Sequence, residues 1–230
     1  MQVEIWSDVV CPWCFIGKRR FETAVAQFGH PVEVVWRSFQ LNPGAPALRE
    51  GSSLERIARK YGITLERAAA QYQRITDLAA AEGLHYHLDQ ARFGQSFDAH
   101  RLLHLARERG MQDAVKERFL AGYLEEGVAI GLREELAPLA VAAGLDAAEV
   151  DAVLAGDAFA DGVRADQERA IEIGITGVPF FVIDGRFAIP GAQDPETILA
   201  TLERARQRSA LELVEPADPA VQCEGDSCAI

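Results

Sequence analysis

Residues 3–14 read VEIWSDVVCPWC, and this stretch decides the fold class. Its first residues alternate between apolar and polar and end in a turn-prone serine–aspartate pair, a pattern that predicts a short strand. Pro12 stands where a helix would begin, because the amide that proline lacks has no partner in a first helical turn. The stretch therefore predicts a strand, a turn that carries Cys11 and Cys14, and a helix.

The residues that follow predict further strands and helices. The apolar face of the first helix runs to Gly29, which favours a helix end, and a β-branched and aromatic run at 32–36 predicts a second strand. Helical periodicity then covers about 52–174 without a strand pattern. Two short apolar runs around an Asp-Gly turn predict a hairpin over 180–189, and a capped helix follows at 195–207. The predicted order is βαβ, a series of helices, and ββα.

Four segments of this chain carry a resemblance to a known family. They are SDVVCPWC at 7–14, FDAHRL at 97–102, GITGVPFF at 174–181 and GAQ at 191–193. With them the chain resembles the DsbA-like thioredoxin superfamily. Within it, the chain resembles the FrnE-type branch, which is related to kappa-class glutathione transferases and 2-hydroxychromene-2-carboxylate isomerases. One departure is Gln95, where the branch commonly has asparagine.

The element order and the resemblance together predict an α/β protein with a thioredoxin fold, in which a helical domain is inserted between the βαβ and ββα halves. The expected thioredoxin-like domain covers 1–48 and 175–208, and the inserted helical domain covers 49–174. Residues 209–230 are Pro-rich and acidic, which predicts a flexible C-terminal tail. This tail carries a CxxxxC motif.

The CxxC motif is the predicted active site. Only a thiolate attacks a disulfide, and a helix N-terminus favours an anion, so we expect a lowered pKa for Cys11 and assign it as the nucleophile. Cys14 is the expected resolving residue, which attacks the mixed disulfide on Cys11. The dipeptide Pro12-Trp13 adjusts the redox potential. Strongly oxidising DsbA-type proteins have histidine at the position of Trp13, so the resemblance implies a weaker oxidant here.

Val178-Pro179 is the second predicted part of the site. X-Pro bonds are cis in only about 5% of cases in folded proteins, so the residues alone favour a trans bond. The resemblance reverses this expectation, because it implies a cis proline that faces the CxxC motif before a strand. Val178 would then offer its backbone groups to an extended peptide, and Pro179 would keep metal away from the thiols.

Composition limits the partners. The formal net charge of −12 repels phosphate backbones and anionic lipid surfaces, so we expect neither a nucleic-acid nor a membrane partner. The amino terminus does not read as a signal peptide, which predicts a cytoplasmic protein whose structural disulfides would be uncommon. The expected partners are disulfide-containing proteins or glutathione-like thiols. No cofactor or metal is predicted, and the oligomeric state is left open.

The second cysteine pair, Cys223 and Cys228, lies in the predicted tail, and its short link contains glycine. Tethering raises local concentration, so this pair could exchange with the CxxC pair as an internal electron relay. Its acidic neighbours should raise the pKa values of both thiols and make them the slower, secondary pair. The alternative is an exposed pair that oxidises adventitiously.

Two other functions stay open on the sequence. One is a glutathione-dependent isomerase or transferase of the 2-hydroxychromene-2-carboxylate isomerase type, although the resemblance places serine at Cys11 in those enzymes. The other is a zinc site formed by all four cysteines. His100 and His104 have an i, i+4 spacing that zinc ligands also use, but we expect hydrogen-bonded packing roles for them.

Overall fold

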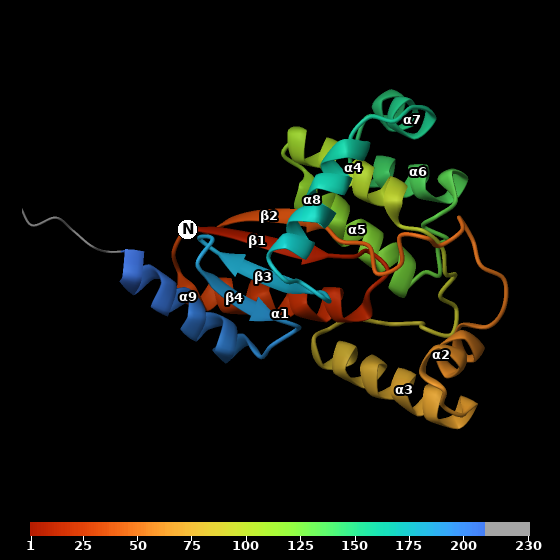
Figure 1. Ribbon diagram of the computed structural model, residues 1–230, viewed down its shortest axis with the longest axis horizontal. Coiled ribbons are helices and arrows are strands. Elements are labelled where there is room, and N and C mark those ends of the chain that lie inside the picture. The colour runs from red at the N-terminus through yellow and green to blue at the C-terminus, as the bar shows by residue number, and fades with distance from the viewer. Residues whose placement is uncertain (210–230) are drawn as a thin grey trace, which may run out of the picture.

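The computed structural model describes residues 1–209, which form a central four-stranded sheet with helices around it (Figure 1). The strand order is β2-β1-β3-β4. Strand β1 (Gln2–Ser7) pairs in parallel with β2 (Glu33–Ser38) and antiparallel with β3 (Phe180–Ile183), which pairs with β4 (Phe187–Pro190). Parallel strands need a crossover, and α1 provides it between β1 and β2.

Helix α1 (Pro12–Phe28) and helix α9 (Pro195–Ser209) pack together under one face of the sheet (Figure 1). Their apolar side chains and the strands share one core, in which the rings of Phe21 and Phe181 stack with centroids 5.5 Å apart. Helix α1 ends as predicted, because Gly29 has a φ of 65°, a left-handed conformation that glycine adopts without strain. The βαβ and ββα halves predicted from the sequence are therefore both present.

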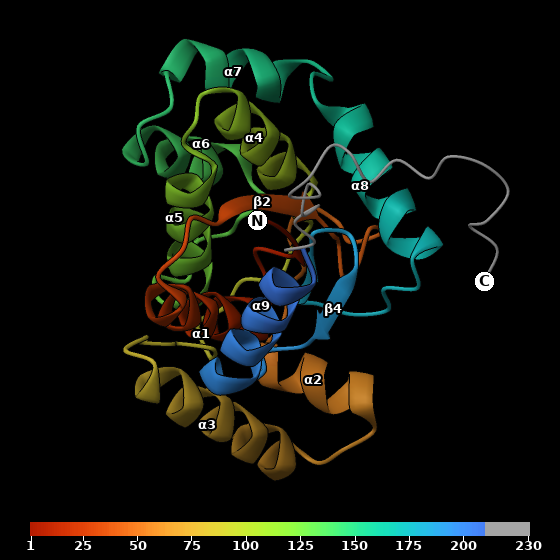
Figure 2. The same ribbon diagram turned by 90° about the vertical axis from the view of Figure 1, so that its left-hand side faces the viewer.

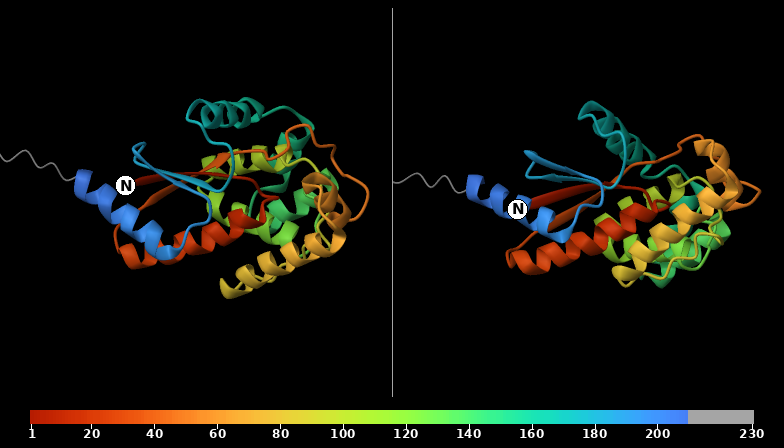
Figure 3. Two further views of the ribbon diagram at one scale, coloured as in Figure 1. Left: turned by 60° about the horizontal axis from the view of Figure 1, so that its bottom comes forward. Right: turned by 90° about the horizontal axis from the view of Figure 1, so that it is seen from below.

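Seven helices lie between β2 and β3 in the chain, which confirms the predicted thioredoxin fold with helices between its two halves. Helices α2 and α3 form a pair beside α1 (Figures 2 and 3), and apolar side chains of α3 join the same core as those of α4 and α5. No helix in residues 1–209 is long and apolar enough to cross a membrane. The bounds are α2 (Ser53–Tyr61), α3 (Leu65–Ala81), α4 (Phe97–Glu108), α5 (Gln112–Leu124), α6 (Arg133–Ala142), α7 (Ala147–Ala155) and α8 (Ala160–Glu172).

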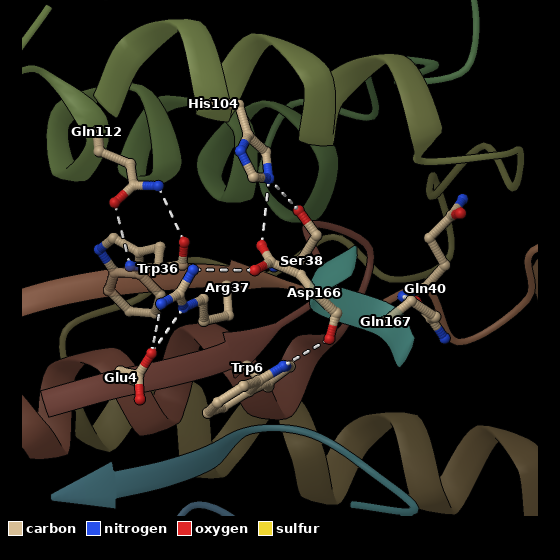
Figure 4. A network of polar contacts seen from close by, with 10 residues as sticks. All are labelled: Glu4, Trp6, Trp36, Arg37, Ser38, Gln40, His104, Gln112, Asp166 and Gln167. Carbon is tan, nitrogen blue, oxygen red and sulfur yellow. Dashed lines mark hydrogen bonds and ion pairs between the residues drawn. The ribbon is translucent and has the colours of Figure 1, made fainter. Parts of the chain in front are cut away.

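Side chains from the helices occupy the outer edge of β2, where a further strand would pair (Figure 4). The backbone amide of Trp36 donates to Gln112 Oε1 at 3.0 Å, and Gln112 Nε2 donates to the carbonyl of Trp36 at 2.9 Å. Two residues on, the amide of Ser38 donates to Asp166 Oδ2 at 2.9 Å. Buried backbone groups need partners, and α5 and α8 supply them here.

Asp166 also joins α8 and α4 to the sheet (Figure 4). Its carboxylate lies 3.1 Å from His104 Nε2 of α4 and 3.1 Å from Arg37 Nη1 of β2. His104 Nε2 is 3.2 Å from Ser38 Oγ, so His104 has the hydrogen-bonded packing role predicted for it. Burial raises the pKa of Asp166, but His104, the Ser38 amide and Arg37 outweigh burial and leave that pKa below its usual value. The carboxylate is thus held in its charged form.

Candidate active site

Cys11 and Cys14 lie at the amino-terminal end of α1, where the sequence predicted them. Cys11 is the extended N-cap residue, and Pro12 is the first helical residue. The amide of Cys14 donates to the carbonyl of Cys11 at 3.0 Å, which forms the first turn of the helix. Both residues are free thiols in the structure and are buried, with 4% of Cys11 and 1% of Cys14 exposed. The sulfurs are therefore held at a helix end and screened from bulk water.

The loop before β3 lies directly against the cysteines. Its Val178-Pro179 peptide is cis, as the family resemblance implied. Cys11 Sγ is 3.6 Å from the carbonyl oxygen of Val178, so a protonated Cys11 donates a hydrogen bond to that carbonyl. Gly17 of α1 permits this approach, because a Cβ at Gly17 would lie 2.8 Å from Pro179 Cγ. The structure brings together the CxxC motif and the cis-proline loop, two regions far apart in the sequence.

A cavity of about 300 Å³ opens beside this loop, lined by residues 176–180, Pro190 and Gly191. Trp13, between the two cysteines, is 37% exposed and one of the few large apolar side chains on the surface. The surroundings of the thiols thus combine an exposed apolar ring with a hollow flanked by backbone groups.

Tyr86 holds the first turn of α1 from the segment between α3 and α4. Its hydroxyl donates to the carbonyl of Pro12 at 2.6 Å, and its ring stacks on Phe15 at 6.3 Å between centroids. Burial raises the pKa of Tyr86 far above its usual value, so the phenol stays protonated. Sequence reasoning missed Tyr86. The sequence signal that could have found it is an alternation of apolar and polar residues at 84–88. Leu84, Tyr86 and Leu88 are buried, whereas the histidines between them are exposed.

A buried carboxylate lies under the CxxC turn. Asp8 is fully buried, and its Oδ2 accepts a hydrogen bond from the amide of Leu41 at 2.8 Å. Its Oδ1 is 3.4 Å from His100 Nε2 of α4. Burial raises the pKa of Asp8, but His100 and the Leu41 amide outweigh this and lower it. Burial lowers the pKa of His100, so a neutral His100 bonds a charged Asp8, and His100 has the hydrogen-bonded role predicted for it.

The two thiols do not share charge in the way the sequence predicted. The neighbouring Cys14 thiol and burial raise the pKa of Cys11 well above its usual value. Burial also raises the pKa of Cys14, but the neighbouring Cys11 thiol, the charge of Lys116 and the nearby Ser7 hydroxyl outweigh burial and lower it. The prediction of a lowered pKa for Cys11 counted the helix end and not the neighbouring thiol, which acts in the opposite direction.

The site residues predicted in the CxxC motif and the cis-proline loop thus meet in space, whereas Cys223 and Cys228 lie outside the described residues. These are two of the four cysteines of the alternative zinc site, so that site cannot be assembled from the described residues. Within residues 1–209, no group of three histidine, cysteine or acidic side chains is placed to hold a metal ion. Sequence reasoning did not assign Asp8, Gly17 or Lys116 to the site.

Comparison with known proteins places this geometry in a family. The model of the DSBA-like thioredoxin domain matches residues 2–203. The uncharacterised protein YwbO of Bacillus subtilis (strain 168) is 30% identical over 204 residues, which are 84% of this chain and 90% of YwbO. The crystal structure of a probable DsbA oxidoreductase from Streptomyces coelicolor is 44% identical with a TM-score of 0.88, over 100% of this chain and 99% of that one.

A more distant structure shares the fold alone. It is a 2-hydroxychromene-2-carboxylate isomerase, 16% identical with a TM-score of 0.66, and the match covers 92% of this chain and 100% of that chain. The matched family model spans both halves of the sheet, the helices between them, the CxxC motif and the cis-proline loop. The chain therefore belongs to the DSBA-like thioredoxin domain family.

Proposed function

We propose that this protein is a thiol–disulfide oxidoreductase or isomerase that acts on protein or small-molecule disulfides through Cys11 and Cys14. The observation that carries the proposal is the position of Cys11 Sγ, at the N-terminus of α1 and 3.6 Å from the carbonyl of Val178 in the cis peptide. Membership of a family of disulfide oxidoreductases supports it. The isomerase of the chromene type shares only the fold, and the two thiols here favour disulfide exchange.

The reduced pair supplies two electrons to a substrate disulfide. The thiolate of Cys11 attacks one substrate sulfur, which forms a mixed disulfide and releases the other sulfur as a thiolate. Cys14 then gives its proton to the released thiolate and, as a thiolate itself, attacks Cys11 Sγ, which forms the Cys11–Cys14 disulfide and releases the second substrate sulfur as a thiolate. The pair shares one proton before the first step, so Cys11 becomes the nucleophile when that proton moves to Cys14.

The surroundings of Cys11 support a substrate with an extended peptide segment. Val178 presents its backbone next to the reactive sulfur, and the cavity at residues 176–180 lies beside it. Exposed Trp13 offers an apolar surface at the same place. We infer that backbone contacts hold such a segment while its sulfur reaches Cys11. Glutathione-like thiols of a reducing cytoplasm would return the Cys11–Cys14 disulfide to the dithiol form.

Replacement of the nucleophile tests this function. In a Cys11→Ala variant we expect loss of insulin reduction, because no other thiol in residues 1–209 faces the cis-proline loop. In a Cys14→Ala variant we expect a trapped mixed disulfide on Cys11, detectable by mass spectrometry. A Cys11→Ala variant that reduces insulin at the parent rate would disprove the proposal. Assay of glutathione conjugation by the parent tests the isomerase or transferase alternative.

A further inference from the structure

The hydroxyl of Tyr86 makes the one hydrogen bond that reaches the backbone of the CxxC motif from a distant segment within residues 1–209. It donates to the carbonyl of Pro12 at 2.6 Å. Pro12 is the first residue of α1, and a carbonyl in the first turn of a helix already accepts the amide four residues further on. The bond from Tyr86 is therefore an addition to the hydrogen bonds of the helix and does not replace one of them.

The chain around Tyr86 is anchored on the helices that surround it. The amide of His87 donates to the carbonyl of Leu124 in α5 at 2.8 Å. The hydroxyl of Ser53 in α2 donates to the carbonyl of Leu88 at 2.9 Å. The Tyr86 side chain is buried, with 4% exposed. Because the segment that carries it is fixed by other helices, the hydroxyl can hold the first turn of α1 in place.

The carbonyl that Tyr86 binds belongs to the same planar peptide group as the amide of Trp13. This peptide is trans, so its carbonyl and its amide point in opposite directions, and amides in a helix point toward the N-terminus, where Cys11 lies. Pro12 has no amide hydrogen, and the amide of Cys14 donates to the carbonyl of Cys11 at 3.0 Å. The amide of Trp13 is therefore the donor that the helix end leaves for the sulfur of its N-cap residue.

The sulfur of Cys11 needs different partners as a thiol and as a thiolate. As a thiol it donates to the carbonyl of Val178 at 3.6 Å and makes no bond to an amide of the helix end. A thiolate has no proton to donate, so it needs a donor instead. Hydrogen bonds to a charged group are the stronger ones, and an amide whose own carbonyl accepts a further bond is polarised and donates more strongly. The reactive form of Cys11 therefore depends on the amide of Trp13.

We propose that Tyr86 is a positioning residue for the nucleophile: its hydroxyl holds and polarises the Pro12-Trp13 peptide so that the amide of Trp13 donates to the thiolate of Cys11. The inference rests on the proposed function, in which Cys11 is the nucleophile. Tyr86 acts through the peptide and not on the sulfur. Burial raises the pKa of Tyr86 far above its usual value, so its hydroxyl remains a donor throughout the pH range in which Cys11 titrates.

The test uses the full chain with Cys14→Ala, Cys223→Ser and Cys228→Ser, in which Cys11 is the only cysteine. Alkylation of Cys11 by iodoacetamide, followed against pH, gives an apparent pKa and a plateau rate at alkaline pH. In Tyr86→Phe, which keeps the ring, we expect that pKa to rise and the rate below it to fall roughly two- to fivefold, with little change in the plateau. A faster reaction at every pH would show a loosened structure and would overturn the inference.

Tyr72→Phe is the matched control in the same background. The hydroxyl of Tyr72 also donates to a backbone carbonyl, that of Ser53 at 3.4 Å, but this carbonyl lies in α2 and not in the CxxC motif. We expect Tyr72→Phe to leave the alkylation profile as it is with both tyrosines present. An unchanged profile in Tyr86→Phe, or an equal shift in Tyr72→Phe, would contradict the proposal.

Other titratable groups do not confound this comparison. Asp8, Lys116 and Tyr123 also act on Cys11 or are acted on by it, and all three are the same in every variant. The difference between Tyr86→Phe and its background therefore reports the one hydroxyl that was removed.

A measurement with Tyr86 in place covers the case in which Tyr86→Phe does not fold. In the single-cysteine background, the amide proton of Trp13 should move downfield in nuclear magnetic resonance spectra as Cys11 loses its proton. The Cζ carbon of Tyr86 should shift with the same midpoint, because the peptide couples the two hydrogen bonds. Signals of Trp13 and Tyr86 that do not follow the titration of Cys11 would overturn the inference.

Failure of the proposed function gives a different result. Neither alkylation nor the resonance measurement uses a disulfide substrate. If the parent does not reduce insulin while both measurements behave as expected, the proposed function is wrong and the role of Tyr86 at the Cys11 thiolate still holds.

Discussion

Gln112 of α5 bonds both backbone groups of Trp36 on β2, with its amide nitrogen 2.9 Å from the carbonyl oxygen and its amide oxygen 3.0 Å from the backbone nitrogen (Figure 4). In Gln112→Ala both backbone groups lose their partner in a buried place. We expect the free energy of unfolding to fall by roughly 1–3 kcal/mol, measured by urea denaturation. Gln73→Ala is the control, because exposed Gln73 bonds only Asp77 on its own helix. Equal losses in the two variants would contradict this account.

Gly17 is where α1 meets the cis-proline loop. Alanine normally stabilises a helix interior by about 1 kcal/mol relative to glycine. In Gly17→Ala we expect the opposite, a loss of roughly 1–3 kcal/mol and slower insulin reduction, because the new Cβ would meet Pro179 Cγ at 2.8 Å. Gly44→Ala, with open space around the new Cβ and no left-handed φ, should be neutral in both assays. A Gly17→Ala variant that is more stable than the parent would show that the cis-proline loop moves away from the new methyl group without cost.

Lys116 should make stability depend on alkaline pH. Its pKa is about 8 in the folded protein against 10.5 ordinarily, so between these values the unfolded chain binds more protons and stability rises with pH. Below pH 8 the cost of the buried charge is fully present, on the order of 3 kcal/mol. We expect Lys116→Met to be more stable at pH 7 and this advantage to shrink above pH 8. Thermal or urea unfolding in a Cys11→Ser/Cys14→Ser background measures it without titrating thiols; because the two sulfurs that raise the pKa of Lys116 are absent there, the advantage should begin to shrink at a lower pH than in the parent. An advantage independent of pH would contradict the prediction.

Cys223 and Cys228 lie outside the described residues, and their role rests on the sequence. If they exchange electrons with the CxxC pair, Cys223→Ser/Cys228→Ser should change turnover or the equilibrium with glutathione while leaving Cys11 alkylation and the unfolding transition as in the parent. In a full-length Cys14→Ala variant, a disulfide between Cys11 and a tail cysteine should be trapped and identified by mass spectrometry. Parent-like behaviour of the double variant, with no trapped disulfide, would exclude the relay.

The sequence predicts the parts of this protein that depend on local order. Pro12 at the first helical position, Gly29 at the helix end and the hairpin before α9 follow from residue preferences over a few positions. The cis bond at Val178-Pro179 could not be derived in that way, because most such bonds are trans. It came from the resemblance to a family.

The charges at the site were beyond sequence reasoning because they depend on contacts between distant segments. Lys116 is about one hundred residues from Cys14, and nothing in its neighbours indicates that its ammonium group is fully buried. The effect of Cys14 on the pKa of Cys11 was missed for the same reason. A helix end is visible in the sequence, whereas the sharing of one proton between two buried thiols is visible only in space.

The edge of β2 has a consequence for association between chains. An edge strand with free amide and carbonyl groups is a template on which a strand of another molecule can pair, which leads to aggregation or domain swapping. The amides of Trp36 and Ser38 are already bonded by Gln112 and Asp166, so an incoming strand would have to displace these side chains. The opposite edge, β4, has only four residues and ends in Pro190, which has no amide hydrogen to donate. The sheet is therefore protected at both edges against growth by addition of strands.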